Sequence, residues 1–171
     1  MAPMTEINDA SFLARFPNLL TGADTQDIAR VVGLLRHRTA GAGEPLIVQG
    51  GHSESLFLIV QGRLRVQIDA DGRRLLLGEV KPGGWVGELS LIKPAPASAT
   101  VTALEDVHAW ALSHKAFEVL RREHPRTASR IIQTVALALV GRLRSSSAQL
   151  IRQVGQGTYT LQSADDTSGM I

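Results

Sequence analysis

The sequence has no cysteine, which excludes a disulfide framework and thiol chemistry. It has no apolar run of about 18 residues, so no membrane span is expected. No block of about five like charges appears, and a formal net charge of +2 is weak evidence for nucleic-acid binding. The N-terminus lacks the basic-then-apolar pattern of a secretory signal. These absences lead us to expect a cytoplasmic protein.

Motifs that carry catalytic or metal chemistry are also missing. There is no serine elbow, no phosphate-binding P-loop and no paired acid motif. The histidines stand apart, without the spacing of metal ligands: His37, His52, His108, His114 and His124. We therefore expect no enzymatic activity. What the chain does have is 171 residues, 44% of them hydrophobic, which suits one domain with a real core plus extensions.

Helical patterns lie at the two ends of the chain. ASFLARF is short and amphipathic, and Asp24 is placed to cap a second helix, DTQDIARVVGLLRHR. After Ser113, a plausible cap, SHKAFEVLRREHP predicts another helix that stops before Pro125. A long helix is predicted over 125–153, with Pro125 in its first turn.

In the middle of the chain, the spacing of apolar residues changes from a helical pattern to a strand pattern. Short apolar or alternating runs such as PLIVQG, SLFLIVQG and RRLLLGEV are bounded by Gly, Pro or Asp, as in the strands of a sandwich or barrel. In RLRVQIDADG, the apolar side chains of Leu64 and Val66 alternate with Arg63 and Arg65, which predicts one buried face and one wet face. Asp71-Gly72 is a strong signal for a hairpin turn.

The predicted long helix carries apolar residues on more than one face. One set is spaced alternately four and three residues apart, as in a short heptad repeat: Ile132, Ala136, Leu139, Leu143, Ser146 and Leu150. A helix that is apolar on several faces needs several partners. We predict a homodimer through this C-terminal helix; the alternative is a helix that packs only on its own domain.

Three segments, GEPLIVQGGHSESLFLIVQGRLRV, PGGWVGELSLI and PASATVTALEDVHAWAL, carry a family resemblance. Together they resemble the cyclic-nucleotide-binding domain of the catabolite-activator type. The resemblance implies a mainly β fold, a double-stranded β-helix or jelly-roll β-roll, with N-terminal helices and a long C-terminal helix. We accordingly divide the chain into an N-terminal arm (1–11), the domain with its long helix (12–153) and a flexible tail (154–171).

The resemblance also implies a ligand site for cAMP or cGMP. Its phosphate-binding cassette maps onto Gly87, Glu88, Leu89, Ser98, Ala99 and Thr100. In that family Gly87 would allow close backbone approach, Glu88 would accept from the ribose hydroxyl, and Ser98 with the Ala99 amide would donate to the phosphate. The competing interpretation of Glu88 is an acid favoured by the dipole at a helix start.

The sharpest departure from the family pattern lies directly after Pro96. The resemblance implies an arginine there, which would pair with the phosphate, but the residue is Ala97. A charged hydrogen bond contributes about 1.5–3 kcal/mol, so its loss should weaken a cyclic nucleotide roughly a hundredfold. Lys93 is a candidate for the compensating charge, and strand arginines such as Arg63 and Arg65 are others.

Two functions therefore stay open. The first is a non-enzymatic sensor, in which a bound nucleotide moves the C-terminal helix and so changes the contact between this chain and an effector protein. The second is a degenerate module without a nucleotide, acting as a dimerisation or docking protein or binding another ligand such as a cyclic dinucleotide. The 18 residues after Gln153 are too few for a helix-turn-helix, so we expect no DNA binding.

Overall fold

The computed structural model describes residues 7–144. Two short helices open the chain, α1 (Asp9–Arg15) and α2 (Thr25–Leu34). As predicted, Asp24 caps α2: its side chain accepts a hydrogen bond from the Asp27 amide.

The predicted helix through Arg38 is wrong at its C-terminal end. α2 ends at Leu34, Leu35 is extended (φ −70°, ψ 148°), and Arg36–Ala40 form strand β1. The reason is tertiary: β1 pairs antiparallel with a strand some 70 residues later, with Arg36 opposite Ala111 and Ala40 opposite Val107. Leu35, which is buried, anchors the change of direction.

Within residues 7–144, nine further strands and a short helix follow β1 before α4 (His114–Glu123). In chain order they are β2 (Pro45–Ile47), β3 (His52–Ser53), β4 (Ser55–Gln61), β5 (Leu64–Ala70), β6 (Arg73–Val80), β7 (Trp85–Val86), α3 (Glu88–Ile92), β8 (Ala95–Pro96), β9 (Thr100–Ala103) and β10 (Val107–Ser113). The turn between β5 and β6 is the predicted Asp71-Gly72 hairpin, with φ of 51° and 72°.

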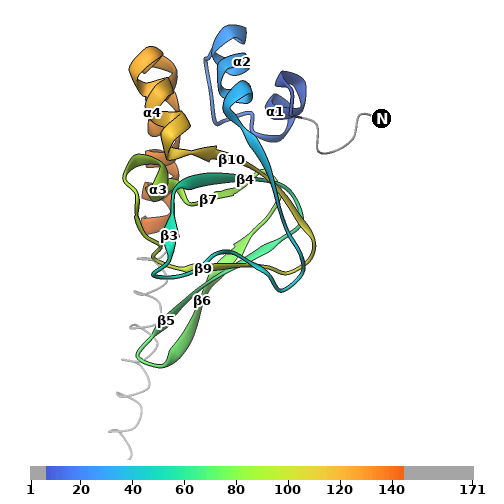
Figure 1. Cartoon of the computed structure of the whole chain (residues 1–171), viewed down its shortest axis with the longest axis vertical. Coiled ribbons are helices and arrows are strands. Elements are labelled where there is room, and N and C mark those ends of the chain that lie inside the picture. The colour runs from blue at the N-terminus through green and yellow to red at the C-terminus, as the bar shows by residue number, and fades with distance from the viewer. Residues whose placement is uncertain (1–6, 145–171) are drawn as a thin grey trace, which may run out of the picture. The chain divides into compact units, whose positions relative to one another are not determined.

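The strands form antiparallel sheets in the orders β1-β10-β4-β7 and β2-β9-β5-β6, with a small third pair β3-β8. This arrangement confirms the predicted mainly β jelly roll with flanking helices. Helices α1, α2 and α4 (His114–Glu123) lie at one end, near β10 and β4, and the β5–β6 hairpin reaches out at the other (Figure 1).

One apolar cluster lies among the strands of both large sheets. Its members include Ile47, Ile59, Leu64, Val86 and Val101, none more than 8% exposed. At the helical end, Phe12 of α1 stacks on Trp110 of β10, with ring centroids 6.5 Å apart. Burial of these aromatic and aliphatic side chains fixes the helices on the sheet.

Ser113 caps α4 as predicted, its hydroxyl oxygen accepting from the Ala116 amide, and the next helix begins at Pro125 and continues to residue 144. The chain divides into two compact units, Met1–Ile132 and Gln133–Ile171, so this helix contributes to both. Residues 145–153 of the predicted long helix, the tail 154–171 and residues 1–6 of the arm lie outside the described residues.

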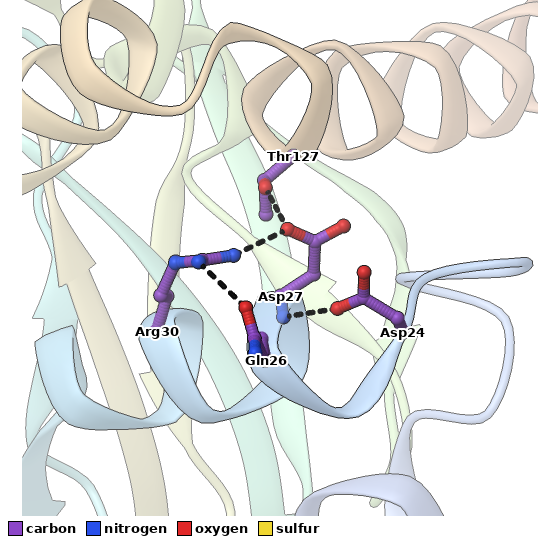
Figure 2. A network of polar contacts seen from close by, with 5 residues as sticks. All are labelled: Asp24, Gln26, Asp27, Arg30 and Thr127. Carbon is purple, nitrogen blue, oxygen red and sulfur yellow. Dashed lines mark hydrogen bonds and ion pairs between the residues drawn. The ribbon is translucent and has the colours of Figure 1, made fainter.

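A polar network within the first unit joins α2 to the start of the last helix (Figure 2). The Thr127 hydroxyl donates to the Asp27 carboxylate, and Arg30 donates to the same oxygen at 3.0 Å. Arg30 also donates to the Gln26 side chain. Thr127 is 1% exposed, so its hydroxyl needs this partner.

We expect Thr127→Val to lower the free energy of unfolding by about 1–2 kcal/mol, because the isosteric side chain removes one charge-assisted hydrogen bond to Asp27. Urea denaturation measures the change. The control is Gln26→Ala, which removes only an exposed contact of Arg30 and should shift stability by about 0.5 kcal/mol or less. Equal effects of the two variants would contradict the role given to Thr127.

A second polar pair joins β1 to β10. The His37 Nε2 and His108 Nδ1 atoms are 3.1 Å apart, and the two rings stack. Partial burial, and then repulsion from His108, lower the pKa of His37. The unfolded chain therefore binds the His37 proton more readily than the folded chain does.

We expect the native chain to lose stability relative to His37→Gln as the pH falls through about 6.5, the ordinary histidine pKa. Above that pH both states carry a neutral His37, and the difference between the two proteins should stay constant. Urea denaturation from pH 8 to pH 5 makes the comparison. If the difference in stability between the two proteins does not change with pH, protonation of His37 is not coupled to folding.

Candidate functional site

Gly87 makes the turn from β7 into α3. Its φ is +82°, a left-handed conformation that favours glycine, and a Cβ on it would lie 2.3 Å from the Ser55 carbonyl oxygen of β4. No side chain fits in that space. The backbone approach that the resemblance implied at Gly87 is thus a close approach to β4.

Most of the residues after Gly87 point inward: Glu88, Ser90 and Leu91 are buried, and Leu89 and Ile92 are exposed. Glu88 is only 8% exposed although it carries a carboxyl group, while Leu89 is 55% exposed. Leu91 is fully buried, and its carbonyl oxygen accepts a hydrogen bond of 2.7 Å from the His114 ring Nδ1. α3 contacts both β4 and α4, and His114, the first residue of α4, ties the two helices together.

The loop after α3 is held by its backbone. β8 pairs with β3, so that Pro96 lies opposite His52. At the next residue, the Ala97 amide donates to the Gly51 carbonyl at 2.9 Å, and the Ala97 carbonyl accepts from the Gly50 amide at 2.8 Å. These two hydrogen bonds fix the path of the chain at Ala97 without any contribution from a side chain.

The predicted phosphate-binding residues follow this anchored point. Ser98 is exposed, and within residues 7–144 the amides of Ser98 and Ala99 donate no hydrogen bond. The Thr100 hydroxyl oxygen accepts from the Gln49 amide at 3.0 Å, so Thr100 holds the 49–51 turn. Two neighbouring backbone donors therefore remain available to an anion.

Both runs of predicted site residues border the apolar cluster of the sheets, which contains Ile47 of β2. The Ile47 side chain lies 3.5 Å from the position of a Cβ on Gly87. Ala97 packs against the apolar cluster that contains Ile47. The structure thus brings the 87–89 and 97–100 segments to the same part of the jelly roll.

At the place of the implied arginine, the structure has a half-buried methyl group. Ala97 contacts the apolar cluster of the sheets instead of presenting a charge. Shape and charge are therefore separated in this cassette: its backbone is formed, and its cation is missing.

Two of the strand arginines, Arg63 and Arg65, face away from the apolar cluster that Ala97 contacts. Arg63 and Arg65 alternate with Leu64 and Val66, which pack in the core, so the arginines occupy the opposite face of β5. Arg63 also pairs with Glu105 at 3.3 Å. Lys93, the C-cap of α3, is exposed and in the described residues makes no side-chain ion pair, so it stays a candidate.

Sequence reasoning missed three residues that position the site. Ser55 offers the carbonyl against which Gly87 turns, Gln49 connects the Thr100 hydroxyl to β5 through its side-chain bonds to the Asp69 backbone, and His114 links α3 to α4. None belongs to a motif. Their roles come from contacts with residues distant in sequence.

Comparison with known proteins identifies the class. Residues 37–124, just over half of the chain, match the cyclic nucleotide-binding domain family, and the chain belongs to that family. The family resemblance read from the three segments is confirmed.

Individual relatives agree with this assignment. The chain is 34% identical over 121 residues to the acetyltransferase Pat of Mycolicibacterium smegmatis, covering 70% of this chain and 35% of that protein. A structure of a cyclic nucleotide-binding domain from Methylobacillus flagellatus has a TM-score of 0.77 at 20% identity, with 85% of each chain covered. A cAMP-binding acyltransferase from Mycobacterium smegmatis has a TM-score of 0.57 at 30% identity, covering 76% of this chain and 40% of that one.

The chain spans about a third or less of the length of the curated relatives it matches. Within residues 7–144, no three metal-ligating side chains gather in one place. In that same part of the chain, no helix combines the length and apolar character needed to cross a bilayer.

We expect Gly87→Ala to lower the free energy of unfolding by about 2–4 kcal/mol, through left-handed strain and the clash with Ser55. Gly72→Ala is the matched control, because Gly72 has a similar φ of 72° with no atom near a Cβ. It should cost about 1 kcal/mol. Chemical denaturation measures both. If Gly87→Ala costs no more than Gly72→Ala, the close approach to Ser55 is not a constraint.

Proposed function

We propose that this chain is a non-enzymatic regulatory module that binds a cyclic mononucleotide, cAMP or cGMP, weakly at the cassette formed by 87–89 and 97–100. The observation that carries the proposal is the formed backbone: Gly87 against Ser55, Ala97 fixed to the 50–51 turn, and the open amides of Ser98 and Ala99. A relative at 30% identity is named as cAMP-binding, which supports the choice of ligand.

Each site residue has a role in this proposal. The Glu88 carboxylate, already buried, accepts hydrogen bonds from the ribose, and the Ser98 and Ala99 amides donate to the phosphate. Leu89 and Thr100 form the edges of the site on the 87–89 and 97–100 segments. Lys93 supplies the positive charge of the site. Without an arginine the phosphate keeps only neutral donors and a flexible lysine, so affinity is low.

The signal leaves the site through α3. Leu91 and His114 share a hydrogen bond, so a shift of α3 changes the position of α4, which precedes the helix that begins at Pro125. A ligand moves this path only if it binds one position of the helices more tightly than the other. In this proposal the chain contacts its effector protein in the cytoplasm.

The last helix also supports a homodimer. In its part within the second unit, Leu137, Val140 and Leu143 are 73%, 44% and 68% exposed, at intervals of three residues. Such an apolar face on a helix favours a second copy of the same helix.

A second candidate function has its own support. Ala97 packs against the core cluster, so an apolar contact stands where the phosphate charge would be. The chain would then act as a dimerisation or docking protein, or would take a different ligand such as a cyclic dinucleotide.

Calorimetric titration of the native chain and Ala97→Arg with cAMP, cGMP and a cyclic dinucleotide separates these functions. We expect the native chain to bind a mononucleotide weakly and Ala97→Arg to bind it about 10- to 150-fold more tightly, the equivalent of about 1.5–3 kcal/mol for a charged hydrogen bond. Ala97→Gln is the matched control: it adds similar bulk without charge and should not gain affinity.

Each other outcome has a meaning. Binding by Ala97→Arg alone would support the docking function, because the native cassette would then have the shape but not the charge needed to bind a nucleotide. Binding of the dinucleotide alone would replace the proposed ligand. If neither protein binds any of the three, the sensor proposal fails.

A further inference from the structure

The β6 strand combines an open edge with an apolar surface. In the described part of the chain, β6 is the last strand of the sheet β2-β9-β5-β6, so one of its edges pairs with no strand. Leu75, Leu76 and Leu77 follow one another on it and are 48%, 65% and 59% exposed. Exposed strand edges usually carry charged residues that prevent pairing, and three leucines favour pairing instead.

Four charged residues around the leucines are arranged symmetrically about Leu76. Arg73 stands three residues before it, and Glu79 three residues after it. Asp71 stands five residues before it, in the hairpin turn, and Lys81 five residues after it, just beyond the strand. Each of these four charges is matched by the opposite charge on the other side of the centre, whereas Arg74, two residues before Leu76, is matched by Gly78.

This symmetry matters because two identical antiparallel strands pair around a two-fold axis. If the axis passes through Leu76, each residue lies opposite the one equally far on the other side. Arg73 then faces Glu79 of the second copy, and Leu75 faces Leu77. The two acids and two bases at these positions each meet the opposite charge, Arg74 lies opposite Gly78, and the leucines meet each other.

The side chains needed for this contact are available. Among residues 7–144, the Arg73 side chain makes no hydrogen bond or ion pair. In the same part of the chain, the Glu79 side chain makes an ion pair with Arg63 at 3.8 Å, whose members are 49% and 40% exposed. Such an exposed pair is weak and does not compete strongly with a second partner.

The register irregularity of the hairpin lies beside this centre. β5 and β6 shift register between Val66 and Gln67, where Leu77 is the extra residue of β6. A bulge increases local twist, and two-stranded ribbons twist more than wide sheets. Two copies related by a two-fold axis bend in the same way there.

We propose that β6 pairs antiparallel with β6 of a second copy of this chain, in a register centred on Leu76. The contact is separate from nucleotide binding and from the pairing of the last helix. Its distinguishing feature is a single register, in which Leu76 faces itself.

The absence of cysteine makes a cross-linking test simple, since each single-cysteine variant has one thiol. Opposite residues in an antiparallel pair have Cβ atoms close enough for a disulfide. We expect Leu76→Cys to form a covalent dimer rapidly under mild oxidation. Leu75→Cys and Leu77→Cys should cross-link slowly alone and rapidly when mixed, because they face each other.

A charge test checks the same register. In a Leu76→Cys background, Arg73→Glu places two acids opposite each other, and Glu79→Arg places two bases opposite each other. Each variant alone should cross-link roughly fivefold more slowly or worse, since like charges in facing positions are destabilising. A mixture of the two restores both opposite pairs and should cross-link mainly as the heterodimer.

Several results would overturn the proposal. One is a Leu76→Cys variant that cross-links no faster than Leu75→Cys. Another is a mixture of the charge variants that gives no preference for the heterodimer. A third is rapid cross-linking of Leu76→Cys to a Leu137→Cys copy, which would place the leucines against a helix of the second copy.

Discussion

The close approach of Gly87 to the Ser55 carbonyl is the contact on which the rest of the cassette depends. It lets β7 turn directly into α3, so that Glu88 is carried inward as the next residue. Ser55 also pairs with Ser113, the residue that caps α4, and the neighbouring Glu54 carbonyl accepts from the His114 amide. One short part of β4 therefore supports the site on one side and the helix that leaves it on the other.

Shape and charge are encoded separately in this site. Glycine at 87 and the backbone bonds of Ala97 give the loop its path, and these do not depend on which side chain stands at 97. The charge of an anion site, in contrast, rests on individual side chains that one substitution can remove. A family fold can therefore persist after its ligand affinity has changed, and membership of the family alone does not fix the ligand.

Much of the fold follows from local patterns. The caps Asp24 and Ser113 and the Asp71-Gly72 turn depend on neighbouring residues, and all three were predicted from the sequence. Arg36–Arg38 were predicted as helix because a polar stretch has no clear period, and pairing with β10 decides their conformation. In the site, the missing arginine is visible in the sequence. The outward orientation of the Arg63 side chain follows from the alternation of side chains along a strand. The roles of Ser55, Gln49 and His114 can be seen only in the folded chain, because their partners are far away in sequence.

The bond between Thr127 and Asp27 spans 100 residues. Since a ribosome makes the chain from its N-terminus, α2 leaves the exit tunnel long before its partner has been synthesised. β1 is in the same position, because β10 comes some 70 residues later. The nascent chain thus carries an unpaired strand and an open helix until nearly the whole domain has emerged, and only then can the first segments reach their final places. Completion of this fold therefore waits for synthesis of the segment that contains β10 and Thr127, and the long loops that must close make it slow.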